Sequence, residues 1–272
     1  MSEFTTSYQQ RFGGIARLYG EMNLQRLAKA HMVVLGIGGV GTWVAEALAR
    51  SGVGTLTLVD LDDICVTNTN RQIHTLASTI GSSKTTIMAD RLRGINPEIN
   101  IIEVSDFIEP ENVHEIITDQ DAVVDAIDAA HAKAAVIAHC KRRKIPMVTV
   151  GSAGGKRDPR LVGSGDLSRT TNDPLLAKTR NQLRRCHHFS RNTKRVFSVE
   201  AIYSTEQMVY PDGDGEICYS ASGMSDGVKL DCAGGFGAAT MITGTFGFVA
   251  ASRVIDRFLI KQAREDQKTQ EK

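Results

Sequence analysis

The stretch VVLGIGGVG, residues 33–41, joins a short apolar run to a group of glycines. A helical pattern follows over residues 40–49, so the stretch predicts a strand, a tight turn and a helix. Gly36 permits the turn, Gly38 lets a phosphate approach the backbone, and Gly41 lets the helix pack close to the strand. A phosphate then lies at the N-terminus of that helix. The stretch predicts a site for an adenine nucleotide, compatible with NAD, FAD or ATP; a turn without a ligand is the alternative.

Apolar runs and helical patterns alternate around this stretch. Strands are predicted at residues 31–36, 55–60, 99–104, 122–127 and 146–150, and helices at residues 1–30, 82–95, 111–118 and 129–143. The run at 122–127 is broken only by Asp125, as expected for a strand buried on both faces. The alternation is typical of an α/β fold with a doubly wound, mainly parallel Rossmann-like sheet.

The alternation stops after Gly151. Residues 151–195 are rich in Gly, Arg, Asp and Thr, residues 196–203 predict a strand of another kind, and residues 211–232 predict a loop. The last ten residues are charged and are expected to fray. We expect one domain over residues 1–272, comprising an N-terminal helical segment (1–30), a nucleotide-binding core (31–150) and a substrate-side lobe with a loop and a closing C-terminal helix (151–272).

Composition narrows the class of protein. The chain has 272 residues, 42% of them hydrophobic, and a formal net charge of +1, so any affinity for nucleic acid must come from a local patch. It has five cysteines and no C-x-x-C pair, which argues against a disulfide scaffold and a zinc ribbon. The stretch MSEFTTSYQQR has no apolar segment of a signal peptide, and we expect a cytoplasmic protein.

Residues 232–252 contain no charge over 21 positions, a length that suits a membrane span. The run is, however, interrupted by five glycines, three threonines and a serine. Ile242, Phe246, Val249 and Val254 instead suit one face of a buried helix. A core helix that closes the fold is therefore favoured, and membrane association is the alternative.

The stretch from Asp60 to Lys84 distinguishes between the nucleotides. Asp60 ends the predicted strand TLTLVD, 19 residues past Gly41, where a carboxylate can hold both hydroxyls of a ribose. Arg71 and Lys84 follow and can neutralise the phosphates of a nucleoside triphosphate. A nicotinamide oxidoreductase would leave these two cations unexplained.

Three further polar residues belong to this interpretation. Asn68 and Gln72 lie beside Arg71, and Asp128 follows the buried strand, at the edge of the sheet where open α/β folds bind ligands. A carboxylate near phosphates most simply holds Mg²⁺. Each residue also has a structural alternative: Lys84 as a solvated helix start, Asp128 as a helix N-cap and Asn68 as a turn residue. Together, behind the glycine turn and Asp60, they indicate an ATP site.

These motifs resemble those of the ubiquitin-activating-enzyme (E1)-like adenylyltransferases over residues 10–150. The shared pattern is GxGGxG, then D-x-D-x-[VI]-x-x-x-N with Arg and Gln close behind, then Lys, then Asp after a buried strand. The resemblance implies that ATP activates a carboxylate as an acyl-adenylate and releases pyrophosphate. It implies the following roles: Gly36, Gly38, Gly39, Gly41 and Gln72 at the nucleotide, Asp60 at the ribose, Asn68, Arg71 and Lys84 at the phosphates, and Asp128 at the metal, with Arg71, Lys84 and Asp128 catalytic.

The chain departs from the family members that activate carrier proteins. It lacks their paired C-x-x-C zinc ligands, and the R-Y-x-R-Q motif near their N-terminus is replaced by Arg11-Phe12-Gly13-Gly14. Arg17, one helical turn further on, is expected to take the place of the missing arginine and reach the phosphates of a partner subunit, with Arg11 as the alternative.

The later stretches VGSAGGKRDP, EAIYSTEQ and GFGAATMITGTFGFVA resemble the tRNA threonylcarbamoyladenosine dehydratase branch of this superfamily. The resemblance implies cyclisation of N6-threonylcarbamoyladenosine at position 37 of tRNA through a carboxyl-adenylate. It also implies a homodimer, ATP with Mg²⁺, a monovalent cation, and a sulfur-transfer or cysteine desulfurase-related partner. Activation of a sulfur-carrier or ubiquitin-like protein is the alternative function.

The run from Lys178 to Arg195 holds seven Lys/Arg, two histidines and no acidic residue. A solvated face usually mixes signs, so this run suggests contacts with a phosphate backbone. The predicted tRNA-binding residues are Arg180, Arg184, Arg185, Arg191, Lys194 and Arg195. Cys186 and Cys232 are candidates for an acyl-accepting thiol, but cyclisation inside one substrate needs no enzyme thioester, so inert thiols are favoured.

Overall fold

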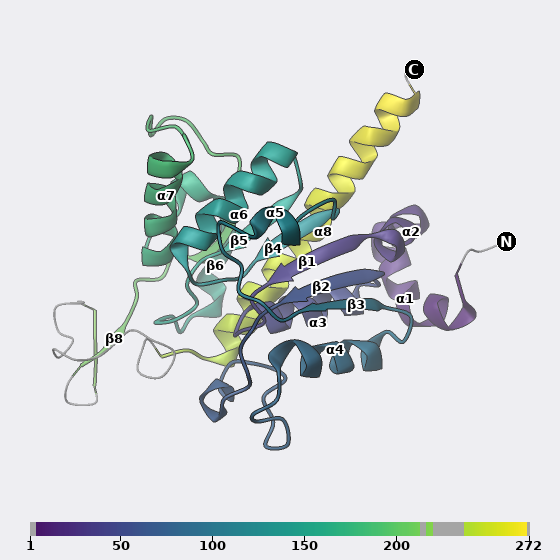
Figure 1. Cartoon of the computed structure of the whole chain (residues 1–272), viewed down its shortest axis with the longest axis horizontal. Helices are drawn as coiled ribbons and strands as arrows, with labels where there is room; N and C mark the ends of the chain where they lie inside the picture. Colours follow the sequence, from purple (N-terminus) through teal and green to yellow (C-terminus); the bar gives the residue numbers. More distant parts are fainter. Residues whose placement is uncertain (1–3, 213–215, 220–236, 271–272) are drawn as a thin grey trace.

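The structure is a computed structural model that describes residues 4–212, 216–219 and 237–270. Its main sheet has seven strands in the order β3-β2-β1-β4-β5-β7-β6 (Figure 1). The strands are β1 (His31–Leu35), β2 (Thr55–Val59), β3 (Asn100–Val104), β4 (Ala122–Asp125), β5 (Met147–Val150), β6 (Val162–Asp166) and β7 (Glu200–Ser204). All neighbours are parallel except β6 and β7. The predicted doubly wound, mainly parallel sheet is confirmed.

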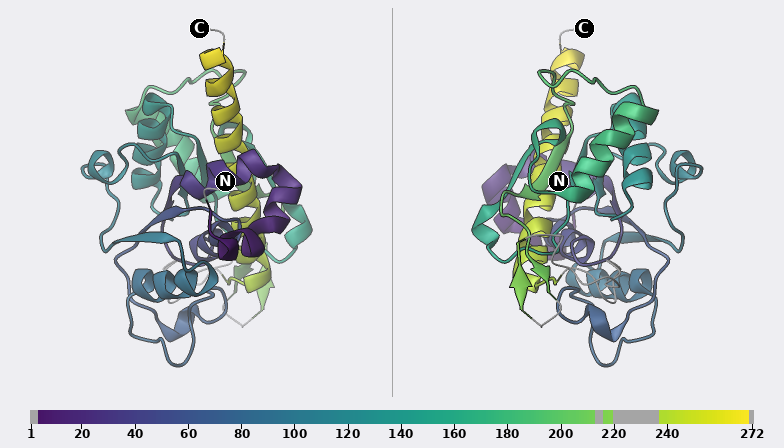
Figure 2. Two further views of the ribbon diagram at one scale, coloured as in Figure 1. Left: turned by 90° about the vertical axis from the view of Figure 1, so that its right-hand side faces the viewer. Right: turned by 90° about the vertical axis from the view of Figure 1, so that its left-hand side faces the viewer.

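Helices cover both faces of this sheet. They are α1 (Thr6–Tyr19), α2 (Glu21–Lys29), α3 (Gly41–Arg50), α4 (Lys84–Ile95), α5 (Val113–Ile116), α6 (Ala130–Arg143), α7 (Pro174–Cys186) and α8 (Thr240–Gln270). Helices α3, α4 and α8 share one buried apolar cluster with the sheet, and α5, α6 and α7 share the other (Figure 2). In β1, Met32 and Val34 belong to the first cluster and Val33 and Leu35 to the second. The strands are continuously apolar because both faces are buried.

The N-terminal helical segment is divided at Gly20, whose φ of 93° ends α1 before α2 begins. Tyr8 of α1 donates a hydrogen bond to the carbonyl of Gly52, 2.5 Å away, in the turn that precedes β2. Helix α1 therefore lies at the amino ends of the strands, opposite the edge that carries the glycine turn.

Helix α8 corrects the prediction for the C-terminal tail. Ile242, Phe246 and Val254 are buried as expected for a core helix, and no described helix is long and apolar enough to cross a membrane. The helix continues to Gln270, through most of the stretch that was expected to fray. Two ion pairs stabilise this end of the helix. Lys261 and Glu265, one turn apart, lie 3.8 Å from each other, and Asp266 pairs with Arg26 of α2. The charge content of the sequence alone does not reveal these pairs.

Residues 151–195 contain two elements that composition concealed, β6 and α7. The start of α7 has a clear local signal, because Asp173 accepts the N–H of Leu176 at 2.8 Å and Pro174 occupies the first turn. The strand predicted at 196–203 is observed as β7, which begins later, at Glu200, and ends at Ser204. The short strands β8 (Tyr210–Pro211) and β9 (Ile217–Cys218) pair at the start of the predicted loop at 211–232, of which residues 213–215 and 220–232 lie outside the described part of the chain.

Candidate active site

The glycine turn has the predicted geometry. Gly36 has a φ of 82°, in the left-handed region that favours glycine, directly after β1. A Cβ at Gly41 would lie 1.7 Å from the carbonyl oxygen of Gly36, so only glycine allows α3 to begin this close to the strand. The turn therefore presents backbone to a ligand at the carboxyl edge of the sheet.

Asp60 is held against this turn from the end of β2. Its Oδ2 accepts the N–H of Ile37 at 2.7 Å, and its Oδ1 accepts the N–H of Asp62 at 2.9 Å. Burial raises the pKa of the Asp60 carboxyl, while the nearby Lys84 ammonium opposes that shift. The side chain is thus fixed beside the glycine turn, where the ribose of a nucleotide is expected.

Arg71 and Gln72 lie over the middle glycines. A Cβ at Gly39 would be 3.3 Å from Cγ and Cδ of Arg71, and one at Gly38 would be 4.0 Å from Nε2 of Gln72. The Arg71 guanidinium donates to the carbonyl of Thr67 at 2.8 Å, which orients its planar fork. The tertiary structure thus brings together the arginine and the glycine turn that the sequence separates.

Lys84 is the first residue of α4, but it is only 6% exposed, so the solvated-helix-start alternative is wrong. Its Nζ lies 2.6 Å from Oδ2 of Asp62 and 3.8 Å from Oδ1 of Asp60. Asn68 is buried, and its Oδ1 accepts the N–H of Cys65 at 2.9 Å. Asn68 therefore also has the structural role in a turn that was its alternative interpretation.

Unpartnered buried polar atoms are concentrated beside these residues. Within the described part of the chain they include Oε1 of Gln72 and Oγ1 of Thr75, and the ring of His74 lies next to them, beside the backbone of Ile37. His74 is 2% exposed, and burial lowers its pKa to about 4, so its ring is neutral. Buried polar groups normally have partners, so this concentration fits a polar ligand. The sequence prediction missed His74, whose only signal was its position two residues after Gln72.

Asp128 lies on the exposed loop between β4 and α6. It does not cap α6, whose N-cap is Ala129, so the N-cap alternative is wrong. Its carboxylate makes no hydrogen bond or ion pair to the described residues. Mg²⁺ commonly uses one or two carboxylates together with substrate phosphates, and an accessible carboxylate at this edge of the sheet is compatible with that ligand set.

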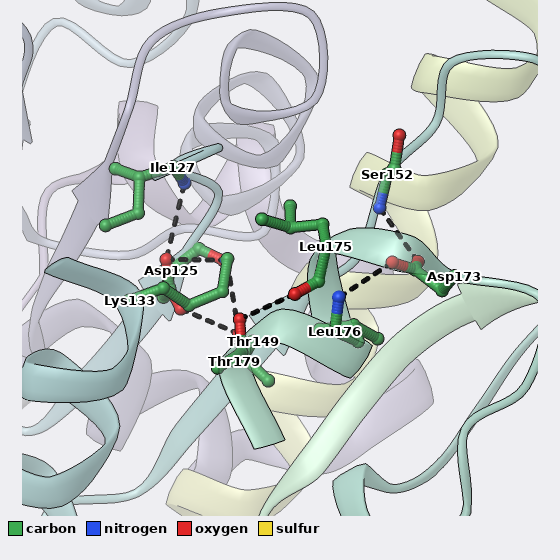
Figure 3. Close-up of polar contacts among 9 residues, drawn as sticks. All are labelled: Asp125, Ile127, Lys133, Thr149, Ser152, Asp173, Leu175, Leu176 and Thr179. Carbon is green, nitrogen blue, oxygen red and sulfur yellow. Dashed lines mark hydrogen bonds and ion pairs between the residues drawn. The ribbon is translucent and has the colours of Figure 1, made fainter. Parts of the chain in front are cut away.

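A buried polar cluster beneath this loop was missed by the sequence prediction (Figure 3). Nζ of Lys133 in α6 lies 2.9 Å from Oδ1 of Asp125, the last residue of β4, and both side chains are fully buried. The hydroxyl of Thr149 donates to Oδ2 of Asp125 at 2.7 Å. Oδ1 also accepts the N–H of Ile127 at 3.3 Å. The ion pair therefore positions the backbone that leads into Asp128.

Several predicted residues lie away from this group. Arg11 and Arg17 lie on α1, at the opposite edge of the sheet, so neither reaches the glycine turn of its own chain. Cys186 is exposed and is the last residue of α7. The other end of this helix lies nearer the site, because Asp173, its N-cap, accepts the N–H of Ser152 just past β5. Cys232 lies outside the described residues.

The basic run is divided between two environments. Arg180 donates to the carbonyl of Leu167 and to Thr170, and the Arg184 guanidinium lies 5.3 Å from the centroid of the Phe197 ring. These two arginines are partly buried. The exposed cations of the run are Lys178, Arg185, Arg191, Lys194 and Arg195.

Comparison with known proteins gives consistent matches over nearly the whole chain. A tRNA threonylcarbamoyladenosine dehydratase of Escherichia coli K12 is 50% identical over 260 residues, 95% of this chain and 97% of that protein. The protein of that name from Haemophilus influenzae Rd is 52% identical over 258 residues, 94% of this chain and 96% of that protein. A crystal structure of the E. coli dehydratase in complex with ATP matches with a TM-score of 0.86 and 47% identity, covering 97% of this chain and 99% of that chain. The ThiF family matches residues 12–269, and the chain belongs to that family.

Proposed function

We propose that this chain catalyses the ATP-dependent cyclisation of N6-threonylcarbamoyladenosine at position 37 of tRNA. The observation that carries the proposal is the position of Arg71 over the glycine turn and of Lys84 beside Asp60, with the loop that leads into Asp128 packed against Gly36 through Ala126 and Ile127. The names of the two dehydratases, about 50% identical over nearly their full lengths, supply the substrate class.

The chemistry follows from this grouping. The substrate carboxylate attacks the α-phosphate of ATP, and pyrophosphate leaves. The carbamoyl group of the same substrate then attacks the activated carbonyl carbon, so that AMP departs with one carboxylate oxygen and a ring closes. The second step is intramolecular and gains from proximity. Arg71 and Lys84 neutralise the charge that develops on the phosphates.

Two further features belong to the proposal. Asp128 holds Mg²⁺, which supplies charge neutralisation and orientation of the phosphates when bound. The protein acts as a homodimer, and the exposed Arg17 reaches the phosphates of its partner. The monovalent cation, the cysteine desulfurase-related partner and the cytoplasmic location stay predictions.

Pyrophosphate release tests the function directly. Purified protein with ATP and tRNA that carries the threonylcarbamoyl group is expected to release pyrophosphate and AMP, and unmodified tRNA is not expected to support release. If a carrier protein with a Gly-Gly tail drives release and modified tRNA does not, the alternative function is correct. Tighter calorimetric binding of NAD⁺ than of ATP·Mg²⁺ would contradict the entire adenylation proposal.

We also propose a tRNA-binding surface that is wider than the predicted run. Lys141, Arg142, Arg143 and Lys144, at the end of α6, are exposed, and the charge of Arg142 acts on His187, the C-cap residue of α7. Nζ of Lys141 donates to the carbonyl of Phe197 at 2.6 Å, which joins this cluster to the segment at 191–195. The surface suits a phosphate backbone because its exposed charges are of one sign.

Salt dependence measures how many of these cations contact phosphates. Replacing Arg185 and Arg191 together by Ala is expected to reduce the log–log slope of tRNA affinity against salt by about one to two units. Arg184 is left intact because its contact with Phe197 contributes to packing. Filter binding across a salt series is the measurement.

The matched control is Arg264→Ala with Lys268→Ala, which removes the same charge from the exposed end of α8. This control is expected to leave the slope unchanged. Equal slopes for wild type and the Arg185/Arg191 double variant would show that these exposed arginines do not contact tRNA.

A further inference from the structure

A second concave site lies beside the start of α7. It has a volume of about 280 Å³, and its wall includes Asn172, Arg180, Gln207, Tyr210 and Tyr219. None of these residues belongs to the predicted ATP site, and only Arg180 belongs to the predicted tRNA-binding set. The cavity is therefore distinct from the predicted ATP site.

Hydrogen bonds hold the walls of this cavity in place. Nζ of Lys156, which is 2% exposed, donates to the carbonyl of Asn172 at 3.0 Å and to the carbonyl of Glu206. Nε2 of Gln207 donates to the carbonyl of Tyr219 at 3.3 Å. The loop before α7 is thus tied to the segment that carries the tyrosines, so the cavity is formed before any ligand arrives.

The cavity opens at the same edge of the sheet as the glycine turn. Asp173 lies in its wall, and its Oδ2 accepts the N–H of Ser152, just past β5, at 2.9 Å. One strand along, Thr149 of β5 pairs with Asp125 of β4, three residues before Asp128 (Figure 3). Neighbouring strands are about 4.8 Å apart, so the cavity wall at Asp173 and the Asp128 loop follow adjacent strands at the same edge of the sheet.

We propose that this cavity receives the modified adenine base of the tRNA substrate. Tyr210, Tyr219 and the Arg180 guanidinium offer flat surfaces on which a purine stacks. The side-chain amides of Asn172 and Gln207 each donate one N–H to a backbone carbonyl, of Thr205 and Tyr219, and keep an oxygen and a second N–H that suit the polar edges of adenine. From there the threonylcarbamoyl group extends along the sheet edge towards the ATP phosphates. The proposal rests on the dehydratase function and names the substrate site within it.

The direction of α7 supports this assignment. The helix has 13 residues, so its ends are roughly 20 Å apart. Its start contributes Pro174, Ala177 and Arg180 to the cavity, and its end carries the exposed Arg185. A base in the cavity and phosphates on the basic surface are thus separated by a few nucleotides of one RNA strand.

Filling the cavity tests the proposal. Ala177→Phe is expected to raise the KM for modified tRNA about tenfold or more, because loss of one stacked base has an effect of that size. The KM for ATP and the salt slope of tRNA binding are expected to remain unchanged. Ala263→Phe, on the exposed end of α8, is the matched control and is expected to leave the KM for tRNA unchanged.

A second pair of variants separates stacking from folding defects. Tyr219 is 58% exposed, so Tyr219→Ala is expected to fold and to raise the KM for tRNA. Tyr219→Phe retains the ring and is expected to have the wild-type KM for tRNA. Calorimetry with free N6-threonylcarbamoyladenosine is expected to detect binding to wild type and not to Ala177→Phe.

The outcomes separate the two proposals. If wild type releases pyrophosphate with modified tRNA but both Ala177→Phe and Tyr219→Ala keep the wild-type KM for tRNA, the cavity assignment is overturned and the dehydratase function stands. A raised KM for ATP in Ala177→Phe would place the nucleotide in the cavity and also overturn the assignment. No pyrophosphate release by wild type would mean that the function itself is wrong.

Discussion

Asp128→Ala and Arg71→Ala each lower ATP–pyrophosphate exchange by at least about 10²-fold, the effect expected when one group that stabilises transition-state charge is removed. Both residues lie on loops at the carboxyl edge of the sheet and have exposed or partly exposed side chains, so the fold is expected to persist. Exchange assays beside thermal melts measure the two effects separately. Arg71→Lys is expected to recover only part of the activity, because an ammonium lacks the planar fork.

The control for this experiment is Asp90→Ala, which removes an exposed carboxylate from α4. It is expected to keep wild-type exchange. Near-full activity in Asp128→Ala would remove Asp128 from the proposed metal site, and the same result in Arg71→Ala would remove that arginine from the phosphate site. A lowered melting temperature in either variant would assign it a structural role instead.

Lys133→Met produces the largest loss of stability that we expect, about 3–5 kcal/mol, because it leaves the Asp125 carboxylate buried without its cation. The double variant Lys133→Met with Asp125→Leu removes both charges and is expected to regain most of that stability. The pyrophosphate exchange of the double variant is expected to stay below that of wild type, because the N–H of Ile127, next to Asp128, loses the Asp125 carboxylate as its acceptor. Urea unfolding and exchange assays on both variants measure the contrast.

Thr149 provides a milder test of the same cluster. Thr149→Val removes only the hydroxyl that donates to Asp125, and it is expected to lower kcat more than it raises the KM for ATP. Thr149→Ser keeps the hydroxyl and is expected to restore kcat. Glu46→Gln, which weakens the contact with Arg91 between α3 and α4, is the control for a structural ion pair. If the Lys133/Asp125 double variant has wild-type exchange, the cluster serves the fold alone.

The glycine turn could be predicted from the sequence because its cause is local. The left-handed backbone at Gly36 and the close approach at Gly41 exclude side chains at fixed positions along the chain, and these requirements appear as spacing. The central strands were predicted for a related reason. Burial on both faces requires uninterrupted apolar runs, and the hydrophobic effect acts on each run whichever neighbours it meets.

The sequence was less informative where a contact joins distant residues. Asp125 was recognised only as an interruption of a strand, because nothing local indicates that Lys133 meets it inside the core. The start of α7 had a local signal in Asp173 and Pro174, but the surrounding Gly, Arg and Thr content favoured a loop. The direction of that helix, and therefore which arginines face solvent, depends on its packing against α6.

The sequence by itself determined the strand–turn–helix, the parallel sheet and the residue types of the nucleotide site, since periodicity and glycine spacing are properties of short segments. Tertiary structure alone decided that Arg71 lies over Gly39, that His74 is buried beside the glycine turn, and that a cavity forms between α7 and residues 207, 208, 210 and 219. Each of these arrangements joins segments whose meeting depends on how whole helices and strands pack. Close packing of the interior fixes those contacts, and no short stretch of residues encodes them.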